Sequence, residues 1–251
     1  MAELPNSLEE AIAQAKEATQ AALNDGYTRL QVELVFPEIA LQAQSIAMQF
    51  TPLFEQYGSG LKIFFPDAGA AALARRDWGE VPFKVSDIGT SRSPVDSRIQ
   101  PEDEAFLIIS PSAVEVAQVE KLCNLAGDRP CVLVNPQLED LYIVGIGYAA
   151  RQVRDRFLQT ITSCYYLRPL EGAALMHSYP GLWQVWLETE SEGNYKLIAE
   201  EPQKPVGETL DKILLKATTP SDASDTIQAL SAPRKPGFLT NLQRFLNALS
   251  R

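Results

Sequence analysis

The 251-residue chain is predicted to form a mainly parallel, doubly wound (Rossmann-like) α/β sheet with an antiparallel extension in its second half. Short apolar runs such as LKIFF, AFLIIS and CVLV are typical of strands that are buried on both faces. Segments with helical periodicity separate these runs, which is the pattern of a parallel sheet. The later strands instead follow one another across tight turns, which indicates antiparallel neighbours.

The first half of the chain alternates predicted helices and strands. Ser7-Leu8-Glu9-Glu10 is a capping box that begins the first helix, and Gly26 follows the end of that helix. Pro37 ends the first strand, and Gly58 ends the second helix. The predicted helices cover 7–24, 39–57 and 112–126, and the segment 66–79 is expected to turn from a strand into a short helix. A polar loop covers 90–104, and the predicted strands are Arg29–Phe36, Leu61–Phe65, Phe83–Ile88, Ala105–Ser110 and Cys131–Val134.

The second half begins with a predicted helix over 148–157. Four successive strands are then expected, namely Thr160–Arg168, Ala173–Met176, Trp183–Glu188 and Tyr195–Glu200. A short helix over 208–216 completes the folded body. The predicted organisation is therefore one α/β domain over 1–216, a linker over 217–237 and a basic amphipathic helix over 238–251.

The net charge of −10 is unevenly distributed. Residues 233–251 carry four basic side chains and no acidic one, so the preceding residues carry −14. An acidic body repels nucleic acid, so no nucleic-acid partner is expected.

The C-terminal segment FLTNLQRFLNALSR is the most distinctive candidate site. At 3.6 residues per turn its apolar side chains share one side of a helix. They are Phe238, Leu239, Leu242, Phe245, Leu246 and Leu249, and the basic residues in or just before the segment are Arg234, Lys235, Arg244 and Arg251. This pattern fits an interfacial helix on an anionic membrane, a helix in a partner's groove, or a helix that packs on the protein's own body.

Other sequence features argue against several classes of protein. No run of 18 apolar residues is present, and the first residues lack the pattern of a secretory signal or transit peptide. Cys123, Cys131 and Cys164 lack CxxC spacing, so they are predicted to be reduced core cysteines. His177 is the only histidine and has no nearby partner motif, so no catalytic residue, metal ion or cofactor is predicted.

A G-x-G-x-x-A string stands between an apolar run and the helix predicted over 148–157. Its glycines, Gly145 and Gly147, would let a pyrophosphate approach the helix N-terminus in a dinucleotide site. The string comes late in the chain, and no acidic ribose ligand is clearly placed after it. A tight turn with close packing is therefore the favoured interpretation.

A second candidate for anion or nucleotide binding is the strand–turn–helix at Pro66-Asp67-Ala68-Gly69, because a helix N-terminus at a strand's carboxyl end can hold an anion. Arginines that could contribute charge are Arg75, Arg76, Arg151 and Arg154. The alternative is that these arginines pair with surface carboxylates.

Aromatic residues gather on the predicted antiparallel strands. Tyr165 and Tyr166 are adjacent, so they point to opposite faces of the sheet. We therefore expect one of them to line an exposed face.

Six strings resemble a family of domains of unknown function from cyanobacteria and chloroplasts. They are SLEEAIAQAKEATQAAL, GYTRLQVEL, FFPDAGAAALARRDWG, GDRPCVLVNPQLED, GIGYAARQVRDRFLQTITSCYYLRPL and YPGLWQVWLE, and the resemblance covers about residues 4–215. The family includes the plant low-photosystem-II-accumulation assembly factor and a domain linked to a plastid adenylate kinase. No GxxxxGK[ST] phosphate loop is present, so the kinase association does not transfer.

The resemblance implies a non-enzymatic auxiliary factor for photosystem II assembly or maintenance. Its implied partner is a photosystem II assembly intermediate, and its implied location is the cytoplasm or stroma, with peripheral contact to the thylakoid membrane. The competing class is an enzyme or sensor that binds a nucleotide or phosphometabolite at the glycine turns and arginines.

Overall fold

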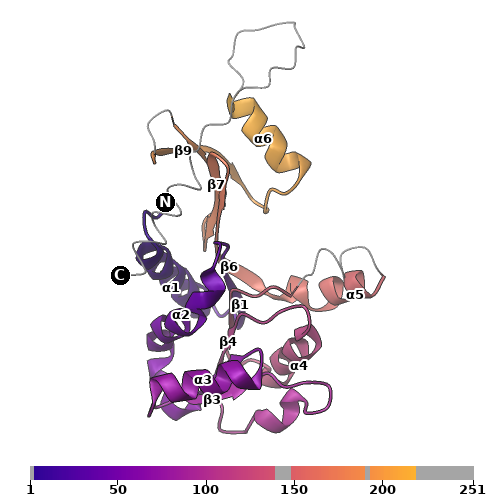
Figure 1. Ribbon diagram of the computed structural model, residues 1–251. Helices are drawn as coiled ribbons and strands as arrows, with labels where there is room; N and C mark the ends of the chain where they lie inside the picture. Colours follow the sequence, from indigo (N-terminus) through magenta and orange to yellow (C-terminus); the bar gives the residue numbers. More distant parts are fainter. Residues whose placement is uncertain (1–2, 139–147, 190–192, 219–251) are drawn as a thin grey trace, which may run out of the picture.

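The computed structural model describes residues 3–138, 148–189 and 193–218. Within these residues, nine strands form one sheet with helices on both faces (Figure 1). The strands are β1 (Arg29–Leu34), β2 (Leu61–Phe65), β3 (Lys84–Asp87), β4 (Ala105–Ile109), β5 (Cys131–Val134), β6 (Thr162–Leu170), β7 (Ala173–Ser178), β8 (Trp183–Glu188) and β9 (Tyr195–Glu201). The α-helices are α1 (Leu8–Asn24), α2 (Ala43–Phe50), α3 (Ala68–Trp78), α4 (Val116–Ala126), α5 (Tyr148–Arg156) and α6 (Glu208–Thr218), and the 3-10 helices are η1 (Ile39–Gln42), η2 (Thr51–Gly60), η3 (Val95–Arg98) and η4 (Leu158–Thr160).

The sheet has the order β3-β2-β4-β5-β1-β6-β7-β8-β9. All neighbours from β3 to β6 pair in parallel, whereas β7, β8 and β9 continue the sheet as antiparallel strands. The predicted α/β class, its parallel part and its antiparallel extension are therefore confirmed. The helix predicted over 208–216 is observed as α6, while the helix predicted over 238–251, most of the linker, Arg234 and Lys235 lie outside the described residues.

Helices cover the two faces of the sheet in separate groups (Figure 1). The α1 face carries α1, α2 and α3, and the α4 face carries α4 and α5, with α6 over the antiparallel end. The buried strands serve both faces: in β2, Ile63 and Phe65 join the core under α1, while Phe64 joins the core under α4. Burying one such side chain contributes about 1.5–3 kcal/mol, which explains why the central strands are continuous apolar runs.

The single helix predicted over 39–57 is wrong. The segment is divided into η1, α2 and η2. Pro52 stands at the start of η2 and lacks the N–H that a continuous helix needs, and Phe54 and Gly58 leave the helical conformation.

The expectation that Tyr165 or Tyr166 lines an exposed face is also wrong. Both are buried, with 0% and 3% of their surfaces exposed. Tyr165 lies in the core under α1, where its hydroxyl donates to Gln14 Oε1 at 3.1 Å. Tyr166 lies on the other face, in the cluster that includes Leu210 of α6. They point to opposite faces, as expected, but helices cover both.

The three cysteines are buried and free, as predicted. Among the described residues, no helix combines the length and apolar character needed to cross a bilayer.

Candidate functional site

The carboxyl edge of the parallel strands is the first place to look for a ligand site. The chain leaves β1 toward α2 on the α1 face, whereas after β5 it reaches α5 on the α4 face. β1 and β5 are neighbours, so their carboxyl ends form a topological switch point, where α/β sheets commonly bind ligands. The ends of β2 and β4 form a second one, because β2 leads to α3 and β4 leads to α4.

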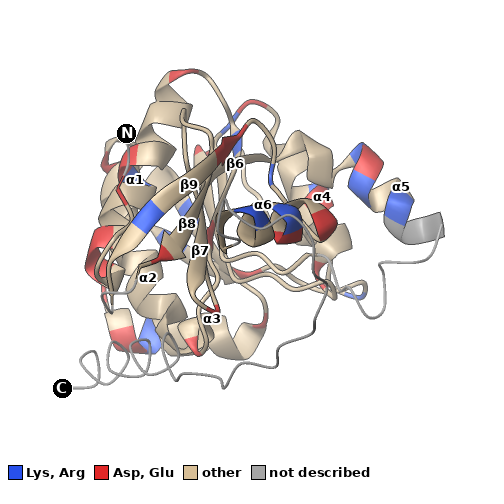
Figure 2. Ribbon diagram, turned by 90° about the horizontal axis from the view of Figure 1, so that it is seen from above, with Lys and Arg blue, Asp and Glu red and all other residues tan. Residues whose placement is uncertain are grey.

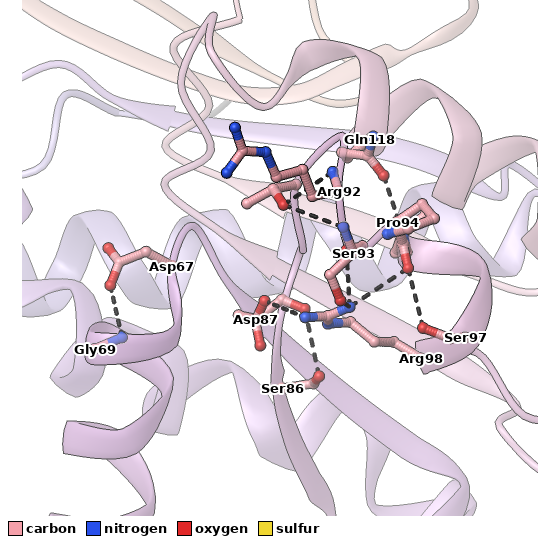
Figure 3. Close-up of polar contacts among 12 residues, drawn as sticks. Asp67, Gly69, Ser86, Asp87, Arg92, Ser93, Pro94, Ser97, Arg98 and Gln118 are labelled. Carbon is pink, nitrogen blue, oxygen red and sulfur yellow. Dashed lines mark hydrogen bonds and ion pairs between the residues drawn. The ribbon is translucent and has the colours of Figure 1, made fainter.

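Asp67 occupies the N-terminus of α3 at this edge. Its Oδ1 accepts a hydrogen bond from the backbone N–H of Gly69 at 2.8 Å (Figure 3) and another from the backbone N–H of Ala70 at 2.9 Å. These are orphan donors that would otherwise be available to an anion. Asp67 and Gly69 thus form an N-cap in which the protein supplies its own anion.

The start of α4 also carries a carboxylate, although Glu115, its N-cap residue, makes no side-chain hydrogen bond to the helix N–H groups. Glu115 Oε2 accepts hydrogen bonds from the Ser112 backbone N–H at 2.8 Å and from Ser112 Oγ at 2.6 Å. Ser112 Oγ in turn accepts the N–H of Val114 at 3.2 Å. A carboxylate therefore lies at the N-terminus of both α3 and α4, and its charge opposes the approach of a phosphate group.

Arg98 closes the loop that follows β3 (Figure 3). Its Nη2 lies 2.8 Å from Asp87 Oδ1, and its Nη1 donates to Ser93 O at 2.9 Å and Ser93 Oγ at 3.0 Å. Only 20% of the Arg98 and Asp87 side-chain surfaces is exposed. The guanidinium is committed to holding the loop, so its role is structural.

Gly89 gives this loop a specific conformational requirement. Its φ of +88° lies in the left-handed region, and an added Cβ would lie 2.4 Å from Ser93 O. We expect Gly89→Ala to lower the free energy of unfolding by roughly 2–4 kcal/mol, from backbone strain and the clash with a backbone atom. Urea unfolding measures the loss.

Gly127→Ala is the matched control for this substitution. Gly127 has a φ of +62°, but nothing lies within 4 Å of its added Cβ. Strain alone predicts a loss of about 1–2 kcal/mol. Equal losses of unfolding free energy for the Gly89 and Gly127 variants would contradict close packing in the loop that follows β3.

The arginines predicted to assist an anion site do not meet at Asp67. Arg75 and Arg76 lie in the last turn of α3, at the opposite end of that helix. Arg75 Nη1 donates to Val85 O of β3 at 3.0 Å, and Arg76 pairs with Asp77 at 2.7 Å.

The remaining predicted residues lie on the α4 face or outside the described residues. Arg151 and Arg154 are on α5, with Arg151 exposed. The sheet therefore separates them from α3. Gly145 and Gly147 lie outside the described residues, so the dinucleotide interpretation stays a prediction.

The sequence interpretation missed a row of polar and aromatic side chains across the α4 face. Directly paired positions place Glu33 of β1, Tyr166 of β6, His177 of β7 and Trp183 of β8 side by side. The alternation in RLQVELVF could have indicated this row. Gln31 and Glu33 are polar residues on a central parallel strand, where apolar residues are usual.

His177 is buried in this row. Its Nε2 lies 3.0 Å from Ser163 O, and its ring stacks on Trp183 with centroids 4.7 Å apart. Burial lowers the pKa of His177, although the backbone of Ser163 and Leu182 opposes this shift. Since a carbonyl only accepts, we assign the proton to Nε2. His177 Nδ1 and Ser163 Oγ have no partner among the described residues, so they can bind water or a polar ligand.

Lys204 completes the aromatic part of this row. Its Nζ lies 3.7 Å from the centroid of the Tyr166 ring and 5.5 Å from that of the Trp183 ring. The two rings are 5.2 Å apart. This cation–π contact ties the segment before α6 to the sheet. Within the described part of the chain, no cluster of three or more His, Cys, Asp or Glu could hold a metal ion.

Comparison with known proteins identifies one family. A family model described as "Domain of unknown function (DUF1995)" matches residues 5–212. No solved structure matches the chain.

Proposed function

We propose a function from the premise that the chain belongs to the DUF1995 family of domains of unknown function, whose model spans most of the chain. The proposed function is that of a non-enzymatic auxiliary factor for photosystem II assembly or maintenance. It would bind an assembly intermediate at the cytoplasmic or stromal surface of the thylakoid membrane. The photosystem II part of the proposal comes from the sequence resemblance described above.

The observation that best supports a binding factor over a nucleotide-binding enzyme is the carboxylate at the N-terminus of both α3 and α4. Asp67 Oδ1 accepts the N–H groups that α3 would otherwise offer to a phosphate, and the Glu115 carboxylate lies at the start of α4, bonded to Ser112. Arg98 at the same edge is committed to Asp87. The described carboxyl edge therefore suits a phosphorylated ligand poorly.

The basic C-terminal segment supports the membrane part of the proposal. Residues 233–251 have four basic side chains and no acidic one. Each basic residue near an anionic surface contributes about 1 kcal/mol, and salt screens this attraction. Reversible, salt-sensitive attachment is the expected behaviour.

Co-sedimentation with anionic liposomes of thylakoid-like lipid composition tests the membrane part. The full chain should sediment at low salt, whereas a 1–232 truncation should remain in solution. In the full chain, Arg244→Gln should weaken binding about fivefold, which corresponds to about 1 kcal/mol. Phe245→Gln should also weaken binding, and it should leave the salt dependence unchanged, because that side chain carries no charge. Equal sedimentation of the full chain and the truncation would exclude the tail as the attachment site.

Deleting the gene in its host tests the assembly part. Photosystem II accumulation should fall, and recovery after photodamage should slow. Unchanged levels and repair would refute this part. A thermal-shift series with nucleotides and phosphosugars should show no stabilisation, and clear stabilisation at millimolar ligand would favour the competing class.

A further inference from the structure

One part of the sheet carries a helix on one face only. β8 and β9 project from the body, and α6 packs on their α4 face (Figure 1). On the α1 face, α1 reaches β7, and Figure 1 shows no described helix over β8 and β9. Elsewhere on this face, α1, α2 and α3 cover the sheet.

The α1 side of β8 and β9 is built from three directly opposite pairs, which we call the arm face. They are Glu188–Tyr195, Trp186–Leu197 and Gln184–Glu200, and a bulge near Trp186 aligns them. Trp186, Tyr195 and Leu197 are each partly exposed, although Trp186 also packs against the core under α1 and only 5% of the Gln184 surface is exposed. The arm face therefore has an aromatic and aliphatic centre, which is the composition of a binding hot spot.

Acidic groups border this centre. Burial raises the pKa of Tyr195, and the nearby charge of Glu188 raises it further, so this carboxylate lies beside the ring. At the other end of the arm face, Glu200 Oε1 accepts a hydrogen bond from Gln184 Nε2 at 3.1 Å. α1, on the same side of the sheet, carries the acidic residues Glu9 and Glu10 in its first turn, and Figure 2 colours its acidic residues red. An occupant of the arm face should therefore be apolar on one side and positively charged.

The chain itself contains such a segment. Residues 238–251 have six large apolar side chains on one side of the predicted helix, and residues 233–251 have four basic side chains and no acidic one. Fourteen helical residues extend about 21 Å, and the six residues of β8 extend about 20 Å. We propose that, in the absence of a membrane, the C-terminal segment 238–251 binds the arm face of its own chain.

The connection is long enough for this contact. α6 ends at Thr218 beside β8 and β9, and 19 residues separate it from Phe238. A flexible linker of that length spans about 25 Å, which exceeds the roughly 20 Å across a sheet with a helix on each side. The tail can therefore pass around the edge strand β9 to the α1 face.

Paramagnetic NMR on the full chain tests the proposal. Ser250→Cys provides a labelling site, because the three native cysteines are fully buried. A nitroxide there should broaden the indole N–H resonance of Trp186 strongly and that of Trp183, on the opposite face, less. Trp78, at the far end of the sheet, should keep its intensity. About 0.5 M salt, where the Debye length is roughly 4 Å, should restore much of the Trp186 signal.

Charge reversal provides the matched variants. Glu188→Lys combined with Glu200→Lys should abolish the selective broadening, while Glu208→Lys on α6 should leave it intact. Absent or unselective broadening, or broadening that survives the double charge reversal, overturns the proposal. Broadening that appears only between labelled and isotope-enriched molecules in a mixture also overturns it, because the tail would then bind a second copy. No membrane or photosystem component is present, so failure here leaves the proposed function untouched.

Discussion

Replacing Asp103 by alanine is expected to lower the free energy of unfolding by about 3–5 kcal/mol. The Asp103 carboxylate is fully buried and lies 3.1 Å from Lys62 Nζ and 2.7 Å from Lys84 Nζ. It also accepts the backbone N–H of Gln100 at 2.8 Å. Only 9% of the Lys62 side chain is exposed, so the substitution leaves a buried ammonium group without its carboxylate. Urea unfolding at neutral pH measures the change.

Glu102→Ala is the control for this substitution. Glu102 also pairs with Lys84, at 3.3 Å, but 65% of its side chain is exposed. Exposed ion pairs contribute about 0–1 kcal/mol, so a small loss is expected. Similar losses of unfolding free energy for Asp103→Ala and Glu102→Ala would contradict the idea that burial determines how much an ion pair stabilises the protein.

The natural protein and the Asp103→Ala variant should differ in their response to acid. Burial raises the pKa of Asp103, but hydrogen bonds from Lys84, the Gln100 backbone and Lys62 outweigh it, so the net effect lowers this pKa. The contribution of Asp103 is then fully present above its unfolded-state pKa of about 3.9 and is lost as pH falls through the lower folded-state value. The natural protein should therefore lose more stability than Asp103→Ala between about pH 5 and pH 2.

The Asp103 cluster illustrates which parts of the fold could not be predicted from sequence. Lys62 belongs to the run LKIFF, which correctly predicted a buried strand, and Asp103 belongs to a polar segment that predicted a loop. Their contact depends on the parallel pairing of β2 with β3 and β4, and local periodicity carries no information on strand order. Apolar runs predicted the strands because burial constrains consecutive residues. An ion pair between strands joins residues far apart in the chain, so it leaves no such local pattern.

The candidate site shows the same division. The placement of Asp67 and Gly69 at a strand–helix junction was predicted, since an Asp before a helix is a local signal. The hydrogen bonds of this N-cap were not predicted: its carboxylate fills the position in which an anionic ligand was expected. The row formed by Glu33, Tyr166 and His177 requires the register of β1, β6 and β7, which are far apart in the chain.

The substitutions Tyr165→Ala and Tyr166→Ala should each lower the free energy of unfolding by about 3–5 kcal/mol. Both side chains are nearly or fully buried, one in the core under α1 and the other in the cluster under α6. The expectation of one exposed tyrosine failed because it treated the antiparallel end as a sheet with one covered face. α6 follows the last strand of that end and folds back over it, which the order of strands along the chain did not reveal.

Tyr27→Ala provides the reference for these two substitutions, because 44% of the Tyr27 surface is exposed and its main aromatic contact is with Tyr179. Its expected loss is roughly 1 kcal/mol. Urea unfolding of the three variants therefore compares the loss of a buried tyrosine on each face of the sheet with the loss of an exposed one. A loss at Tyr166 no larger than that at Tyr27 would mean that α6 does not seal its face, whereas large losses at both Tyr165 and Tyr166 require that both faces of the sheet are closed at β6.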